Sequence, residues 1–84
     1  MENVQNINLI LDIDIDRESE EDIASAFSKA IEEKGFKLSD NTVSLRNNRL
    51  SSIRAVDTAS GEEVEMYAFS RSVNGKTIIS LKII

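Results

Sequence analysis

The feature that most constrains the fold is the dipeptide Asn74-Gly75, which lies between two segments rich in alternating apolar residues. Both residues tolerate positive φ angles, so the pair predicts a β-hairpin with a two-residue loop. Such a loop also fixes which residues lie opposite each other. The pairs expected on an apolar core face are Val73 with Lys76, Ser70 with Ile79, Ala68 with Leu81 and Met66 with Ile83. The pairs expected on the outer face are Arg71 with Ile78, Phe69 with Ser80 and Tyr67 with Lys82.

A second hairpin is predicted around the turn residues Thr58 to Gly61. A four-residue loop there places Ala55 opposite Val64 and Ile53 opposite Met66 on the core face. The outer face then pairs Arg54 with Glu65, Ser52 with Tyr67 and Leu50 with Phe69. The pairing of Arg54 with Glu65 joins opposite charges, which supports this register. For residues 42–57 two readings stay open: a further hairpin with its tip at Asn47-Asn48, or one bent strand.

The first part of the chain changes its hydrophobic period once. From Asn6 to Asp16 apolar and polar residues alternate, which predicts a strand with Asp12, Asp14 and Asp16 on its solvated face. The period then becomes helical, and the expected buried stripe consists of Ile23, Ala26, Phe27, Ala30 and Ile31. Ser19 is the expected N-cap, with Asp16 as a competitor. Gly35 suits the left-handed position just after the helix.

These elements predict an α+β fold with the order β-α-β-β-β and room for one more strand. A chain of 84 residues is expected to form a single domain, residues 1–84, with one core. One amphipathic helix then packs on one face of an antiparallel sheet. The order of elements resembles the cystatin topology, but the QxVxG and Pro-Trp motifs of that family are absent, so no residue role is carried over.

The residue types of this chain argue against catalysis. The sequence contains no cysteine and no histidine, which removes thiol nucleophiles, thiolate metal sites and the commonest general base. The three glycines are explained as a helix cap and turns, so no phosphate-binding loop is predicted. We therefore expect no enzyme activity and no cofactor. The lack of a signal-peptide pattern or a long apolar run leads us to expect a cytoplasmic protein without membrane contact.

The stretch DIDIDRESEED, residues 12–22, is the most acidic part of the chain. Its first three aspartates match the start of a calcium-binding loop, but Arg17 replaces the glycine and Ile23 the final glutamate. We expect no metal site, and a divalent-cation-binding protein is the alternative. Solvated strand residues and helix-start residues explain each part of the stretch separately, and its density leaves room for a second role. The hypothesis carried forward is a surface for a basic partner, formed by Asp12, Asp14, Asp16, Glu18, Glu20, Glu21 and Asp22.

The outer face of the predicted sheet is unusually apolar. One helix cannot cover both faces, and a leftover apolar patch usually marks an interface. The alternative is that the chain's ends or residues 36–49 fold over it. Basic residues near Tyr67 and Phe69 suggest a nucleic-acid platform, but the net charge of −5 argues against direct nucleic-acid binding. The residues predicted on this surface are Leu50, Val56, Tyr67, Phe69, Ile78 and Ile84, with Ile10 if the first strand joins.

The function expected from these features is that of a non-catalytic protein-binding domain. In size, acidity and lack of catalytic residues the chain resembles small acidic proteins of phages and mobile elements that block host nucleases by covering basic channels. The first hypothesis is therefore an inhibitor that occludes a basic surface of a partner protein. The alternative is a structural or assembly subunit that oligomerises through its sheet face, with a homodimer as the simplest case.

Overall fold

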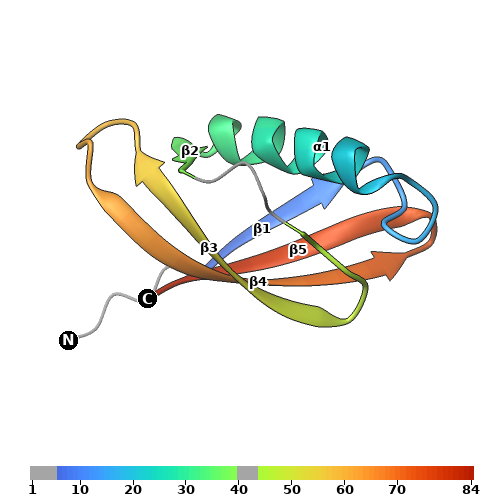
Figure 1. Ribbon diagram of the computed structural model, residues 1–84. Helices are drawn as coiled ribbons and strands as arrows, with labels where there is room; N and C mark the ends of the chain where they lie inside the picture. Colours follow the sequence, from blue (N-terminus) through green and yellow to red (C-terminus); the bar gives the residue numbers. More distant parts are fainter. Residues whose placement is uncertain (1–5, 40–43) are drawn as a thin grey trace.

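The computed structural model describes residues 6–39 and 44–84 of the chain. One helix lies across one face of a curled five-stranded antiparallel sheet, and together they form a single compact α+β domain (Figure 1). The strand order in the sheet is β1-β5-β4-β3-β2, so β1 and β2 form the two edges. The elements are β1 (Asn6–Leu11), α1 (Glu20–Glu33), β2 (Phe36–Leu38), β3 (Arg49–Asp57), β4 (Glu63–Val73) and β5 (Lys76–Ile83).

Both predicted hairpin registers are confirmed. Asn74 and Gly75 adopt φ angles of 52° and 80°, and Val73 lies opposite Lys76, as the two-residue loop requires. In the second hairpin, Ala55 lies opposite Val64 and Arg54 opposite Glu65. The core-face assignment of the Val73–Lys76 pair was wrong, because both residues have the parity of the outer face and are exposed. The corresponding core positions belong to Ser72 and the buried Thr77.

The first strand is shorter than its alternation predicts. It ends at Leu11, and the residues after it form turns, so Asp12, Asp14 and Asp16 do not line a strand face. The main-chain oxygen of Asp14 accepts hydrogen bonds from the N–H groups of Arg17 and Glu18, both at 3.0 Å. These bonds close a helical turn, which a strand cannot contain. The alternation continues because Ile15 reaches the core from this turn.

A buried hydroxyl holds the turn against the sheet. Thr77 Oγ1 accepts a hydrogen bond from the N–H of Ile15 and donates one to the carbonyl of Ile13, both at 2.8 Å. Thr77 itself is fully buried on β5. One side chain therefore supplies both a donor and an acceptor to main-chain groups that leave the sheet ladder at Leu11.

The helix forms as its sequence predicts. Ser19 is the N-cap, and its side chain accepts a hydrogen bond from the N–H of Asp22 at 3.2 Å. The buried stripe consists of Ile23, Phe27 and Ile31, with the two predicted alanines partly buried beside it. Gly35 follows the helix with a φ of 93°, which only glycine adopts without strain. No helix in the described part of the chain is long and apolar enough to cross a membrane.

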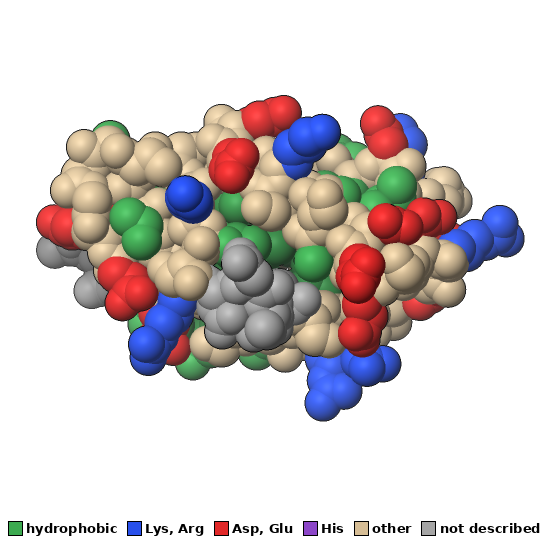
Figure 2. Space-filling model, turned by 45° about the horizontal axis from the view of Figure 1, so that its top comes forward, with side chains coloured by type: hydrophobic (Ala, Val, Ile, Leu, Met, Phe, Trp, Pro, Cys, Tyr) green, Lys and Arg blue, Asp and Glu red, His purple; other side chains and the backbone are tan. Residues whose placement is uncertain are grey.

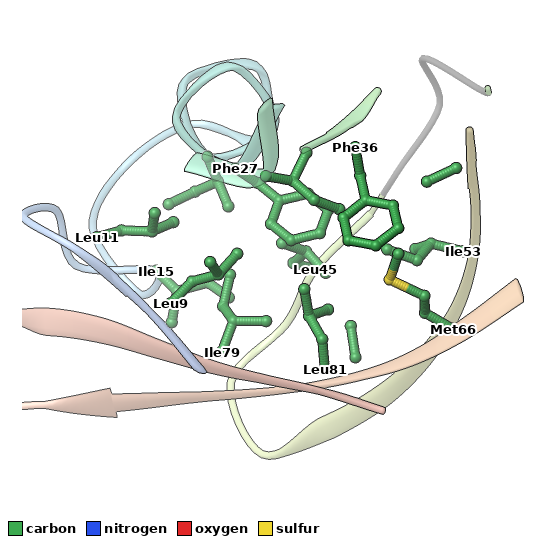
Figure 3. Packing of buried hydrophobic residues seen from close by; sticks show 14 residues of the cluster. Leu9, Leu11, Ile15, Phe27, Phe36, Leu45, Ile53, Met66, Ile79 and Leu81 are labelled. Carbon is green, nitrogen blue, oxygen red and sulfur yellow. The ribbon is translucent and has the colours of Figure 1, made fainter. Parts of the chain in front are cut away.

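The core lies between α1 and the inner face of the sheet. Phe27 and Phe36 lie next to each other under the helix, with Leu9, Ile79 and Leu81 on the sheet side (Figure 3). Both rings are buried. Because the helix, the turn after β1 and the buried Leu45 all pack on this inner face, the core is one-sided.

The additional strand lies before residues 42–57, for which a further hairpin or one bent strand was expected. It is β2, at Phe36–Leu38, which pairs with Ala55 to Asp57 and was not predicted as a strand. Residues 44–48 contain no strand, and β3 begins at Arg49 after Asn48 has turned the chain with a φ of 59°. Residues 42 and 43 lie outside the described residues. Neither a hairpin at Asn47-Asn48 nor one bent strand is therefore correct.

Candidate functional site

The acidic stretch lies at one end of the molecule, where β1, the start of α1 and the β4–β5 hairpin meet. The structure divides its seven acidic residues among three settings. Asp12 follows the edge strand, Asp14 and Asp16 lie in the turn, and the remaining four lie just before or within the first turn of the helix. Asp12, Asp14 and Glu18 line one shallow hollow together with Ile13, Arg17 and Gly75.

Asp14 and Asp16 have structural partners. Asp14 Oδ1 accepts hydrogen bonds from the N–H of Asp16 and from Ser72 Oγ, both at 2.9 Å. The main-chain bond from Asp16 and the hydroxyl bond from Ser72 lower the pKa of Asp14 below its ordinary value of 3.8. Asp16 Oδ2 accepts from Asn47 Nδ2 at 2.9 Å, and Asn47 Oδ1 accepts from the N–H of Ser72 at 3.0 Å. This network ties the turn to β4.

Sequence reasoning missed Asn47, Ser72 and Thr77 as partners of the turn. The contact between Asp14 and the N–H two residues later is a local turn signal that the sequence carries. The other partners are 31 to 64 positions away along the chain. No local pattern identifies them, because they approach the turn only after the sheet has formed.

Two more acidic residues form ion pairs on the surface. Asp12 lies 3.6 Å from Lys76 Nζ, and Glu20 lies 3.3 Å from Arg46 Nη2. These side chains are largely exposed, so each pair contributes at most about 1 kcal/mol. Within residues 6–39 and 44–84, no three acidic side chains gather into a group that could hold a metal ion. The prediction that the aspartates bind no metal stays a prediction.

The helix side of the molecule remains acidic despite these pairs. Residues 12–34 contain nine acidic and three basic side chains. Figure 2 shows this side, where Asp and Glu side chains are spread across the face, with Lys and Arg side chains near several of them. Glu18, Glu21 and Asp22 are exposed there. This side can attract a basic partner, although fewer carboxylates are available than the sequence suggests.

The outer face of the sheet carries the clearest unexplained surface. Ile10, Leu50 and Tyr67 are 67%, 58% and 42% exposed. Phe69 lies opposite Leu50, and Ile78 lies opposite Ile10, both half-buried. No described segment folds over this face, since the helix and Leu45 both pack on the other one. We call Ile10, Leu50, Tyr67, Phe69 and Ile78 the outer patch.

A shallow hollow of about 610 Å³ lies within this face. Leu50, Tyr67 and Phe69 supply its apolar wall, and the other lining residues are Asn6, Asn8, Ser80, Leu81 and Lys82. The structure thus brings Leu50, Tyr67 and Phe69 together at this hollow, and it places Ile78 on the same face but outside the lining, opposite Ile10 and Arg71. It separates Val56, which pairs with Glu63 and Lys37 beyond the row of Arg54 and Glu65. Ile84 is 65% exposed after the end of β5.

The charges around the outer patch differ from those of the helix side. Arg71 lies opposite Ile78, and Lys82 lies opposite Tyr67, so basic residues flank the patch. Asp12 borders it through its pair with Lys76, whereas Glu20, Glu21 and Asp22 begin the helix on the other side of the sheet. The two predicted binding surfaces are thus largely separate. Comparisons with protein-family models, curated proteins and solved structures give no match for this chain.

Proposed function

We propose that this protein is a non-catalytic domain that acts by binding another protein through the outer patch. The observation that carries the proposal is the exposure of Ile10, Leu50 and Tyr67 on a face that no described segment covers. Single exposed apolar side chains are common, but a contiguous group on one face is typical of an interface. The shallow hollow beside Tyr67 and Phe69 gives a partner side chain a place to pack.

The chemistry of the described groups supports binding rather than catalysis. Hydrogen bonds that hold a turn lower the pKa of Asp14. A general base works best with a pKa near the working pH, so a more acidic carboxylate is poorly suited to that role. The sequence supplies no histidine or cysteine to replace it.

The partner surface is expected to be apolar with an acidic rim. Tyr67 and Phe69 are the kind of aromatic anchors that dominate binding energy at the centre of an interface. Arg71 and Lys82 flank them and favour carboxylates on the partner. Leu50 extends the same surface onto β3.

Site-specific photo-crosslinking in the source cell tests this proposal. A photoreactive phenylalanine analogue at position 67 lies on the outer patch, and the same analogue at the exposed helix position 29 is the matched control. We expect position 67 to give a discrete protein adduct that mass spectrometry identifies and that Leu50→Asp abolishes. Position 29 is expected not to give that adduct. Equal labelling from both positions, or an adduct indifferent to Leu50→Asp, contradicts the proposal.

A second candidate function uses the helix side. The excess of acidic over basic residues between positions 12 and 34 favours an inhibitor that covers a basic groove of a partner. Changing Glu18, Glu20 and Glu21 together to Gln is then expected to slow association with that partner and to flatten its salt dependence. The triple variant must be compared with wild type in stability, because each lost charge at the helix start costs roughly 0.3–1 kcal/mol. Unchanged association at both low and high salt contradicts this candidate.

A further inference from the structure

The two edge strands of the sheet, β2 and β1, differ in the features that discourage pairing with a strand of another molecule. β2 is three residues long and carries Lys37, and short length and charge both discourage pairing with another strand. β1 is six residues long, with the sequence NINLIL, and contains neither a charge nor a proline. Its side chains Asn6, Asn8 and Ile10 are exposed. Within residues 6–39 and 44–84 no strand pairs with the outer side of β1, so this edge is available to another strand.

The hairpin register determines which main-chain groups of β1 point outward. Val73 and Lys76 close the two-residue turn as a hydrogen-bonded pair, and such pairs alternate along antiparallel strands. Residues 77, 79 and 81 of β5 therefore direct their main-chain groups toward β1, where they meet Leu11, Leu9 and Ile7. The main-chain groups of Asn6, Asn8 and Ile10 consequently point away from the sheet.

We propose that a second copy of this chain occupies the β1 edge, so that two five-stranded sheets join into one ten-stranded antiparallel sheet. An antiparallel pair of identical strands is related by a two-fold axis. Placing Asn8 opposite Asn8 of the second copy sets Asn6 opposite Ile10 in both directions. In this register the outward-pointing main-chain groups of Asn6, Asn8 and Ile10 can all form hydrogen bonds with the second copy.

The chemistry of the edge fits an identical partner. Asn8 opposite its own copy brings together two neutral amides, each of which can donate and accept a hydrogen bond. Ile10, the most exposed large apolar side chain of the described residues, gains cover from the second copy. The two outer patches become parts of one longer face. Ile10 belongs to both the β1 edge and the outer patch, but the inference rests on the outward-pointing main-chain groups of β1 and not on the hollow beside Tyr67 and Phe69, so it can fail while the proposed function stands.

Sedimentation equilibrium of the full chain over a wide concentration range tests the inference. We expect a reversible monomer–dimer equilibrium. Asn8→Lys places two like charges opposite each other at the two-fold axis and is expected to weaken the dimer by at least about tenfold. Ser52→Lys adds the same charge at an exposed position of β3, away from the edge, and is the control that leaves the dimer unchanged. A monomer at all concentrations, or equal weakening by both variants, overturns the inference.

Hydrogen exchange gives a second readout that depends on register. The amides of Ile7, Leu9 and Leu11 face β5 and are expected to be protected at every concentration. The amides of Asn8 and Ile10 are expected to exchange rapidly in the monomer and more slowly as the concentration rises. Concentration-independent exchange at Asn8 and Ile10 in wild type rules out pairing along β1. Loss of protection at Leu9 in Asn8→Lys shows that this variant has damaged β1. Asn8→Glu then replaces it and is judged by the same two measurements, the monomer–dimer equilibrium and the exchange of the β1 amides.

Discussion

At the scale of single residues, two buried hydroxyls on the inner face of the sheet have opposite roles. Thr77 Oγ1 forms two hydrogen bonds to the main chain of the turn after β1. Ser70 Oγ is equally buried but has no hydrogen-bond partner in the described part of the chain. A buried hydroxyl stabilises the fold only when it is paired, and it otherwise costs the free energy of its lost hydration.

Substitutions at these two positions are therefore expected to change stability in opposite directions. Thr77→Val keeps the shape but leaves the N–H of Ile15 without its partner, and we expect the free energy of unfolding to fall by about 1–3 kcal/mol. Ser70→Ala removes an unpaired group, and we expect a rise of roughly 1 kcal/mol. Urea unfolding of the two variants beside wild type measures both effects. Destabilisation by Ser70→Ala would show that its hydroxyl is hydrogen-bonded in solution.

Asp14 is expected to make stability depend on pH. Hydrogen bonds in the folded state lower the pKa of Asp14 below its ordinary value of 3.8. The contribution of Asp14 to the free energy of unfolding is therefore fully present above pH 3.8 and is lost as the pH falls through the lower folded-state pKa. The difference in stability between wild type and Asp14→Asn is thus expected to be constant near neutral pH and to shrink below about pH 4. Thermal unfolding at a series of pH values measures this difference. Asp12→Asn is the control, because the Asp12 side chain is 89% exposed in wild type. We expect this variant to change the free energy of unfolding much less than Asp14→Asn does.

At the scale of elements, the helix depends on its N-cap for the direction in which the chain leaves the acidic turn. Ser19 supplies the capping oxygen. Ser19→Ala is expected to lower the free energy of unfolding by about 1 kcal/mol. Ser25→Ala changes the same residue type at an exposed interior position, where alanine is the better helix former, and is expected to be neutral or slightly stabilising. If both variants behave alike in chemical unfolding, Ser19 is not the cap.

The hairpins were predictable from the sequence because their information is local. Asn74-Gly75 and the loop at residues 58–61 each fix a register, and every predicted pair along β3, β4 and β5 is present. The pair Val73–Lys76 was predicted in the correct register but was assigned to the wrong face of the sheet. The position of β1 beside β5 was not predictable, because it depends on contacts across about 70 residues. β2 was missed because three residues are too few to show a period.

The candidate site was predictable to a similar extent. Leu50, Tyr67, Phe69 and Ile78 follow from the hairpin registers, and their shared face was therefore correct. Val56 has the same parity but lies beyond Arg54, and parity alone does not show that distance. The acidic stretch was read as a strand face because Ile13 and Ile15 continue the alternation. Its true geometry depends on Thr77, Ser72 and Asn47, which local sequence cannot identify.

At the scale of the whole molecule, charge and apolar surface lie on opposite sides of the sheet. The helix side carries most of the acidic residues, and the outer face carries the exposed apolar side chains with Arg71 and Lys82 beside them. A basic partner and an apolar partner with an acidic rim would therefore approach from different directions. The central claim is that the outer patch is open in the monomer and available for binding.

Acrylamide quenching of tyrosine fluorescence tests that claim most directly. The chain contains one tyrosine and no tryptophan, so its emission reports on Tyr67 and hence on the outer patch alone. The measurement is made at a concentration where sedimentation shows a monomer, with the urea-unfolded chain as the fully exposed reference. Because Tyr67 is 42% exposed, we expect a quenching constant of the same order as that of the unfolded chain. A native monomer whose tyrosine resists acrylamide would contradict the account, because some part of the chain would then cover the outer patch.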